Sequence, residues 1–272
     1  MNKNYTLING QLAAKEDARL SITDLAFQRG YGIFDFFKTV DGQPVFLDDH
    51  LDRLYFSAAE MYLPVIDRVQ LKENIQLLME KNHLPDSGIR ITVTGGCSED
   101  GYKTGTPNTV ITQTPFRYNS ENFDKGTRLV TYEHQRQLPR VKTIDYLQAI
   151  RLQSFVQQNN ADDVLYHSQS AVSECPRSNF FLVNGQHKII TPAANVLEGI
   201  TRKKILSFTG FNTKEAIITL ADIAGAREAF ITSTTKMVLP VLAINGVAIG
   251  NGKPGMLTKE IFQQLLQCQG IQ

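Results

Sequence analysis

The sequence contains no tryptophan and only three cysteines, Cys97, Cys175 and Cys268. These cysteines form no Cys-x-x-Cys pair, and none has the spacing to histidine that a zinc site needs. We therefore expect neither a disulfide framework nor a bound metal. An odd number of isolated cysteines favours a reducing compartment, which predicts a cytoplasmic protein.

The sequence also lacks any block of charge of one sign. Its 28 basic and 27 acidic side chains leave a formal charge of +1, without a basic run or an acidic tail. Nucleic acid and membrane surfaces are therefore not expected partners, and small-molecule ligands are. The N-terminal stretch MNKNYTLINGQLAAKED has no long apolar run, so neither a signal peptide nor a membrane anchor is expected.

Turn dipeptides between β-prone runs are present instead. Asn-Gly or Asp-Gly separates two apolar runs at four places, namely 9–10, 41–42, 184–185 and 245–246. Each pair favours the tight turn of a β-hairpin, because both residues tolerate a positive φ. Four hairpins are predicted.

Helical patterns alternate with these strands. The clearest covers 49–63, where apolar residues recur every three or four positions and Arg53 lies on the opposite side, facing either solvent or something other than core. Further helices are expected at 68–82, 199–208, 220–228 and 256–268. The pattern predicts a mixed α/β (α+β) protein in two segments, a smaller N-terminal one (1–118) and a larger C-terminal one (129–272), joined by a polar linker (119–128).

Two charged residues are candidates for chemistry. Lys142 lies in LPRVKTIDYLQAIRL, between a loop with proline and a predicted amphipathic helix. Its amine is either a solvated surface charge or a nucleophile. Glu174 lies 32 residues further on, before a predicted hairpin strand. Its carboxylate either caps local structure or serves a site.

Two further segments have the chemistry of an anion site. Gly199 precedes Ile200 and Thr201 at a predicted helix start, where free N–H groups attract phosphate, although simple capping by Thr201 explains the pattern equally. The second segment, 232–235, reads Thr-Ser-Thr-Thr. Its hydroxyls either fill a polar loop or donate to phosphate oxygens, with Arg53 as a cationic partner.

Taken in order, HLDRL, Lys142, Glu174 followed by SNFF, GITRK, and TSTT with LPV resemble the class IV aminotransferases. That family includes branched-chain and D-amino-acid aminotransferases and aminodeoxychorismate lyase, and the resemblance extends from about residue 5 to the C-terminus. It implies a fold-type IV enzyme with pyridoxal 5′-phosphate in the cleft between two domains. It also implies a homodimer in which the neighbouring subunit supplies part of each site.

Carried over to this sequence, the resemblance assigns roles to individual residues. Lys142 would form the Schiff base with pyridoxal phosphate and shuttle the substrate's α-proton. Glu174 would pair with the pyridine nitrogen and keep the ring an electron sink. The remaining cofactor-binding positions are Arg53, Ser178, Asn179, Ile200, Thr201, Ser233 and Thr234.

The sequence departs from the family pattern at three places. Pro176 stands where a small residue usually follows the glutamate by two. In RGYGIFD, Tyr31 replaces the aspartate of a common Gly-Asp-Gly, and Asp35 stands where glutamate is frequent. Because RGYGIFD lies in the segment that shapes the substrate pocket, Tyr31 is a candidate substrate contact.

Two other candidate substrate contacts are Arg90, in the strand GIRITV, and Tyr102, in the glycine-rich loop 95–105. Arg90 lies at about the place where branched-chain enzymes carry an arginine for the substrate carboxylate, but it can equally be a strand-edge charge. The loop is a candidate mobile wall of the pocket.

Three functions are compatible with these residues. The first is an aminotransferase that moves an amino group between an amino acid and a 2-oxo acid, and we favour it because TSTT and Arg90 match that branch. The second is 4-amino-4-deoxychorismate lyase, which releases pyruvate and 4-aminobenzoate, and which TGGCSEDGYK and MVLPV resemble. The third is a homologue that binds pyridoxal phosphate without turnover; an intact Lys142 and Glu174 argue against it.

Overall fold

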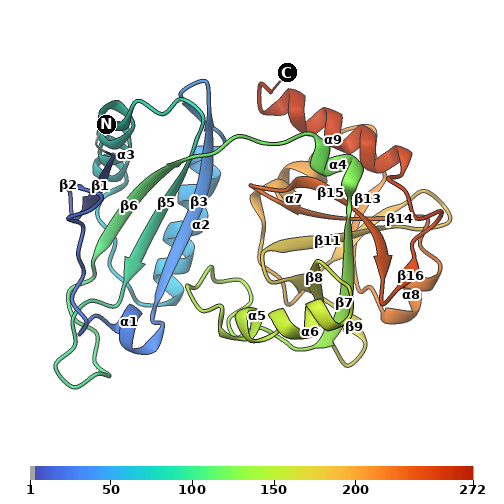
Figure 1. Cartoon of the computed structure of the whole chain (residues 1–272), viewed down its shortest axis with the longest axis horizontal. Helices are drawn as coiled ribbons and strands as arrows, with labels where there is room; N and C mark the ends of the chain where they lie inside the picture. Colours follow the sequence, from blue (N-terminus) through green and yellow to red (C-terminus); the bar gives the residue numbers. More distant parts are fainter. Residues whose placement is uncertain (1–3, 272) are drawn as a thin grey trace. The chain divides into compact units, whose positions relative to one another are not determined.

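A computed structural model describes residues 4–271, which form two compact units (Figure 1). The first unit comprises the described residues up to Arg117 together with Val141–Asp145, and the second comprises Tyr118–Arg140 and the residues from Tyr146 onward. Residues 1–3 lie outside the described residues. They belong to the N-terminal stretch in which no signal peptide was expected. The chain therefore leaves the first unit after Arg117 and returns to it for five residues around Lys142.

The first unit contains a six-stranded antiparallel sheet with the order β2-β1-β6-β5-β3-β4. Its strands are β1 (Tyr5–Ile8), β2 (Gln11–Ala14), β3 (Gly32–Val40), β4 (Gln43–Pro44), β5 (Ser87–Thr94) and β6 (Thr109–Pro115). Its helices are α1 (Leu25–Arg29), α2 (Leu47–Glu60) and α3 (Arg68–Asn82). The helices predicted at 49–63 and 68–82 correspond to α2 and α3.

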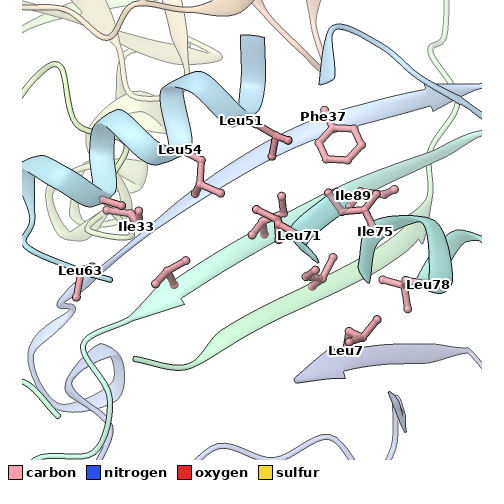
Figure 2. Packing of buried hydrophobic residues seen from close by; sticks show 14 of the residues in the cluster. Leu7, Ile33, Phe37, Leu51, Leu54, Leu63, Leu71, Ile75, Leu78 and Ile89 are labelled. Atoms are coloured by element: carbon pink, nitrogen blue, oxygen red, sulfur yellow. The ribbon is translucent and has the colours of Figure 1, made fainter. Parts of the chain in front are cut away.

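The core of this unit is formed by α2, α3 and the strands (Figure 2). Ile33 and Phe37 of β3 and Leu51 and Leu54 of α2 are completely buried, at 0% exposure. The two strand residues are four apart and the two helix residues three apart, so each pair lies on one face of its element. The apolar periods of strand and helix therefore meet in one cluster.

The second unit is built on a ten-stranded mixed sheet (Figure 1), with the path β13-β12-β11-β14-β15-β7-β8-β9 and two strands at its side. Its strands are β7 (Thr127–Glu133), β8 (Asp163–Ser168), β9 (Ala171–Val172), β10 (Glu174–Cys175), β11 (Ser178–Val183), β12 (Ile189–Pro192), β13 (Thr213–Ala216), β14 (Glu228–Ser233), β15 (Met237–Ile244) and β16 (Val247–Ala248). Its helices are α4 (Glu121–Lys125), α5 (Leu147–Arg151), α6 (Gln153–Gln158), α7 (Ile200–Leu206), α8 (Leu220–Ala224) and α9 (Met256–Cys268).

Strand β11 is the best-protected strand of this sheet, since all six of its residues are buried. Phe180 and Leu182 belong to one hydrophobic cluster, and Phe181 and Val183 to another that includes residues of α7 and α9. A strand covered on both faces needs apolar residues at consecutive positions rather than in alternation, which explains the run FFLV. The site segments on either side of this run are thereby attached to a rigid strand.

Three of the four predicted hairpins have the predicted two-residue turn. At 9–10, 41–42 and 245–246 both residues have positive φ, and the flanking residues pair directly. The hairpin predicted at 184–185 is also confirmed, since β11 and β12 pair antiparallel, but residues 184–188 form a wider loop between Val183 and Ile189. There Asn184 Oδ1 accepts from the N–H groups of Gln186 and Lys188, so the asparagine organises the loop through its side chain.

The residues expected to link two domains have structure of their own. Segment 119–128 contains α4 and the first residues of β7, both in the second unit. Phe123 of α4 is buried at 5% exposure and stacks on Phe262 of α9 with ring centroids 4.7 Å apart. This segment therefore packs into the core that α9 covers.

Replacing Leu71 by alanine should destabilise the first unit by about 2–5 kcal/mol, because this residue of α3 is 0% exposed and its loss leaves a cavity. Urea and thermal unfolding measure the change. The matched control is Val69→Ala in the same helix, where the side chain is 65% exposed and a much smaller effect is expected. Equal losses in the two variants would contradict the core described here.

Candidate active site

Lys142 is attached to the first unit by backbone hydrogen bonds. Its carbonyl accepts from Phe34 N at 2.9 Å, and the Ile144 N–H donates to Gly32 O at 3.1 Å, so residues 142–144 pair with the start of β3. Its own N–H donates to Ser57 Oγ of α2 at 3.2 Å. The backbone of Lys142 is thus fixed to both a strand and a helix.

Two cations share the ring of Phe34. The Lys142 amine lies 4.6 Å from the ring centroid, and the Arg90 guanidinium carbon lies 3.7 Å from it. Arg90 Nε also donates to Thr92 Oγ1 at 3.4 Å on the same strand. An amine and a guanidinium therefore lie close to the centre of one aromatic ring, an arrangement that suits a small anionic substrate.

Arg53, which the apolar stripe of α2 placed toward either solvent or something other than core, is 9% exposed and paired with Asp35 of β3. Arg53 Nε and Nη2 donate to the two Asp35 oxygens at 2.8 and 2.9 Å. His50 Nδ1 lies 2.7 Å from Asp35 Oδ1. Arg53 therefore lies off the apolar face of α2 and still is buried, because its charge is paired with a buried carboxylate of the sheet.

The pKa values of Asp35 and His50 are both shifted by burial and by their charged neighbours. Complete burial alone would raise the pKa of Asp35, but Arg53 and His50 together hold that pKa well below its usual range. Burial lowers the pKa of His50 despite the opposing effect of Asp35, so the imidazole is neutral near pH 7. With its proton on Nδ1, neutral His50 donates to the carboxylate, and the pair that remains is Arg53 and Asp35.

Glu174 is the corresponding buried carboxylate of the second unit, at 4% exposure. Its Oε1 accepts from Arg136 Nε at 2.9 Å. Its Oε2 accepts from Leu197 N at 3.0 Å and from Asn179 Nδ2 at 3.2 Å. Arg136 was not among the predicted site residues, because no local pattern distinguishes this arginine from others in its loop.

The start of α7 is fitted closely against Asn179. Asn179 Nδ2 donates to Leu197 O at 2.7 Å, and a Cβ at Gly199 would come within 2.0 Å of Asn179 Oδ1. Only glycine fits at such an approach. Gly199 is the N-cap residue of α7, and no side chain caps the helix, so Thr201 does not serve as the helix cap. Ile200 and Thr201 are both buried, at 5% exposure.

Two buried hydroxyl oxygens near Asn179 have no hydrogen-bond partner among the described residues. The first is Ser178 Oγ, one residue before Asn179 on β11. The second is Thr232 Oγ1 on β14, the strand next to β11, where Thr232 is the residue that pairs with Asn179. The following Ser233 Oγ accepts from Lys236 N at 3.1 Å, and Thr234 is half-buried. Because buried polar atoms rarely lack partners, these hydroxyls fit a bound group with several polar atoms, as pyridoxal phosphate has.

The two candidate tyrosines are placed differently. Tyr31 packs against the first core and its hydroxyl donates to Met61 O at 2.6 Å. Tyr102 is 86% exposed in the glycine-rich loop. At the base of that loop, Gly105 N donates to Gly95 O at 2.9 Å, and a Cβ at Gly96 would approach Thr106 O to 2.1 Å. The loop base is therefore closed by tight backbone contacts.

The fold is shared with solved aminotransferases. The chain matches a branched-chain amino acid aminotransferase from Escherichia coli with a TM-score of 0.89 and 23% identity, covering 97% of this chain and 94% of that one. It matches a T.th. branched-chain enzyme with pyridoxamine 5′-phosphate at a TM-score of 0.90 and 21% identity, covering 99% and 95%. This is the fold-type IV architecture that the motifs implied.

The sequence comparisons define the family. The model of the amino-transferase class IV family matches residues 32–244, and D-alanine aminotransferase from Bacillus licheniformis is 30% identical over 265 residues, 94% of this chain and 93% of the relative. The chain belongs to the class IV aminotransferases. It is an enzyme of amino-group transfer with pyridoxal 5′-phosphate as cofactor, and the lyase and non-catalytic alternatives are not favoured.

The described residues contain neither a metal-binding cluster nor a membrane-spanning helix. No group of histidine, cysteine, aspartate and glutamate there has an arrangement that could hold a metal ion. In the same part of the chain, no helix has the length and apolar character that crossing a membrane would require.

Replacing Asp35 by alanine should destabilise the protein by about 3–5 kcal/mol, because Arg53 would remain buried without its counter-ion. Thermal unfolding measures the loss. The control is Asp48→Ala in α2, whose 70% exposed carboxylate pairs with Arg68 and Lys72 and should matter far less. A similar loss in both variants would count against a special role of the buried pair.

The difference between wild type and Asp35→Ala should depend on pH in one direction. The folded-state pKa of Asp35 is depressed, so its stabilisation is fully present above the unfolded pKa of about 3.9 and declines as the pH falls below it. The gap between the two proteins should therefore be constant near neutral pH and begin to narrow as the pH falls through about 3.9 toward 3. A gap that stays constant over this range would contradict the shift.

Proposed function

We propose that Lys142 is the catalytic lysine of an aminotransferase that moves an amino group from a small α-amino acid to a 2-oxo acid. The observation that carries this proposal is the pair of cations on Phe34, where the Lys142 amine and the Arg90 guanidinium lie on one ring. Arg90 would bind the α-carboxylate of the substrate and so bring the α-carbon to the amine.

Each residue of the site has a definable task. Pyridoxal phosphate supplies the electron sink for the negative charge left when the α-proton departs. Lys142 Nζ would accept that proton and return it. Glu174, held in orientation by Arg136, Asn179 and the Leu197 N–H, would face the pyridine nitrogen as a fixed negative charge.

The phosphate of the cofactor requires a cation and several hydrogen-bond donors. Arg53 would contribute positive charge, with its orientation set by Asp35. The remaining anchors would be backbone N–H groups and hydroxyls, for which we nominate Ser178, Asn179, Ile200, Thr201, Ser233 and Thr234. The unpartnered Ser178 Oγ supports this assignment.

D-Alanine is the first donor to test, because it is the substrate named for the Bacillus licheniformis relative. Branched-chain L-amino acids are the second candidate, supported by the position of Arg90 on β5. Tyr31 would form a wall of the substrate site through its ring, since its hydroxyl is engaged with Met61. Tyr102 and the loop 95–105 remain candidates for a wall that closes over substrate.

We also propose that the enzyme is a homodimer in the cytoplasm. Family resemblance supports the dimer, and the three cysteines, all free in the structure, are compatible with a reducing compartment. Light scattering coupled to gel filtration should give about twice the chain mass of 30.5 kDa. A mass of one chain would overturn the dimer.

Lys142→Ala should lower kcat by at least about 10³-fold, because both the covalent attachment and the proton transfer are lost. The measurement is pyruvate formed from D-alanine with 2-oxoglutarate, alongside the visible absorption of the lysine-bound cofactor, which should disappear. L-Leucine and L-valine are tested in parallel as donors.

The control is Lys125→Ala, an exposed lysine of α4 paired with Glu121, which should retain both activity and absorption. Retention of the visible band in Lys142→Ala would exclude this lysine as the attachment point. Release of 4-aminobenzoate from aminodeoxychorismate by wild type, without amino transfer from any donor, would reverse the assignment of the reaction.

A further inference from the structure

The hydroxyl segment 232–235 lies at the end of a hairpin of the second unit. Strands β14 and β15 pair as far as Ser233 and Met237, so residues 234–236 form the connection. Met237 is 0% exposed, so the base of the hairpin is buried. Ser233 Oγ accepts from the Lys236 N–H at 3.1 Å, which ties the last residue of the connection to a hydroxyl at its start.

The side chain of Lys236 extends from this connection to another strand. Its Nζ donates to Asp163 Oδ2 at 2.9 Å, and Asp163 is the first residue of β8, three steps along the sheet from β14. The two side chains are 22% and 11% exposed, whereas those of Lys125 and Glu121 are 67% and 71% exposed. A largely buried ion pair is screened little by solvent, and an unpaired charge at that depth is costly, so each partner keeps the other in place.

The carboxylate of Asp163 takes its direction from its own strand. Its Oδ1 accepts from Val164 N at 2.9 Å, while Oδ2 receives Lys236. Burial raises the pKa of the Cys175 thiol, and the charges of Asp163 and Lys236 also affect it, so the ion pair lies near that thiol. Cys175 follows Glu174 in β10. The ion pair is therefore a neighbour of the strand that carries the proposed partner of the pyridine nitrogen.

The hydroxyls of the hairpin can donate to an anion only if the turn holds them in line. Ser233 Oγ accepts from the Lys236 N–H and so keeps its own proton for an outside acceptor. Thr232 Oγ1 is buried and has no hydrogen-bond partner among the described residues. Because a hydrogen bond weakens steeply with misalignment, the value of these donors depends on the conformation of the backbone that carries them.

We propose that Lys236 is a positioning residue of the phosphate site. Through its ion pair with Asp163, it holds the connection in the conformation in which Ser233 and Thr234 donate to the phosphate of the cofactor. This rests on the proposed function, which nominates those two hydroxyls as anchors. Lys236 itself does not touch the phosphate and takes no part in the proton transfer.

The test compares the binding of pyridoxal phosphate and pyridoxal to the full-length enzyme freed of cofactor. Both aldehydes can react with Lys142, but only the first carries a phosphate, so the ratio of the two dissociation constants isolates the phosphate site. In Lys236→Met, the preference for pyridoxal phosphate should fall by at least about tenfold, since aligned hydrogen bonds to a charged group are lost. Lys236→Arg, which can still pair with Asp163, should recover most of the preference.

A second variant tests the contact from its other side. Asp163→Asn should lower the preference as Lys236→Met does, and the double variant should lower it no further, because both changes break one ion pair. Asp163→Asn also keeps the test available if Lys236→Met does not fold. The control is Arg128→Gln, which breaks the exposed pair with Asp162 next to Asp163 and should leave the preference unchanged.

Three results would overturn the proposal. Equal weakening of both aldehydes would give Lys236 a role in the fold alone. A preference lost in Lys236→Met but kept in Asp163→Asn would mean that the lysine binds the phosphate directly, and no change in either variant would separate the ion pair from the cofactor. Failure of the proposed function is distinguishable, because wild type would then transfer no amino group from any donor, whatever the ratio in the variants.

Discussion

The return of five residues to the first unit is the constraint on which the rest of the site depends. Lys142 and Ile144 pair with the first residues of β3, and Val141 is buried in the first core at 2% exposure. A lysine in a free loop would sample many positions, and ordering it at each turnover would cost conformational entropy. Backbone pairing removes most of that freedom in the fold itself, before any ligand binds.

Each unit contains a buried ion pair between an arginine and a carboxylate. Arg53 with Asp35 and Arg136 with Glu174 each place a guanidinium against a carboxylate that is almost inaccessible to water. Neither pair is a strong source of stability, because desolvation offsets much of the attraction. Each pair fixes the direction of a charged group to which the proposed function gives a role, and a further hydrogen bond from His50 or Asn179 holds the carboxylate.

Local sequence predicted most of the elements because their causes are local. Asn-Gly and Asp-Gly turns need only a tolerance for positive φ, and three of them formed tight hairpins as expected. The fourth, at Asn184, opened into a wider loop through side-chain hydrogen bonds that the dipeptide does not encode. The helical stripe placed Arg53 off the core-facing side of α2, but it could not show that β3 brings a carboxylate there.

The sequence by itself determined the family, the cofactor and the kind of reaction, because Schiff-base chemistry requires particular residue types in an order that can be read along the chain. Only the tertiary structure decided which charges are paired. Asp35 and Arg53 are 18 positions apart, and Arg136 and Glu174 are 38. Contacts over such separations depend on how strands and helices pack, which no local pattern in the sequence encodes.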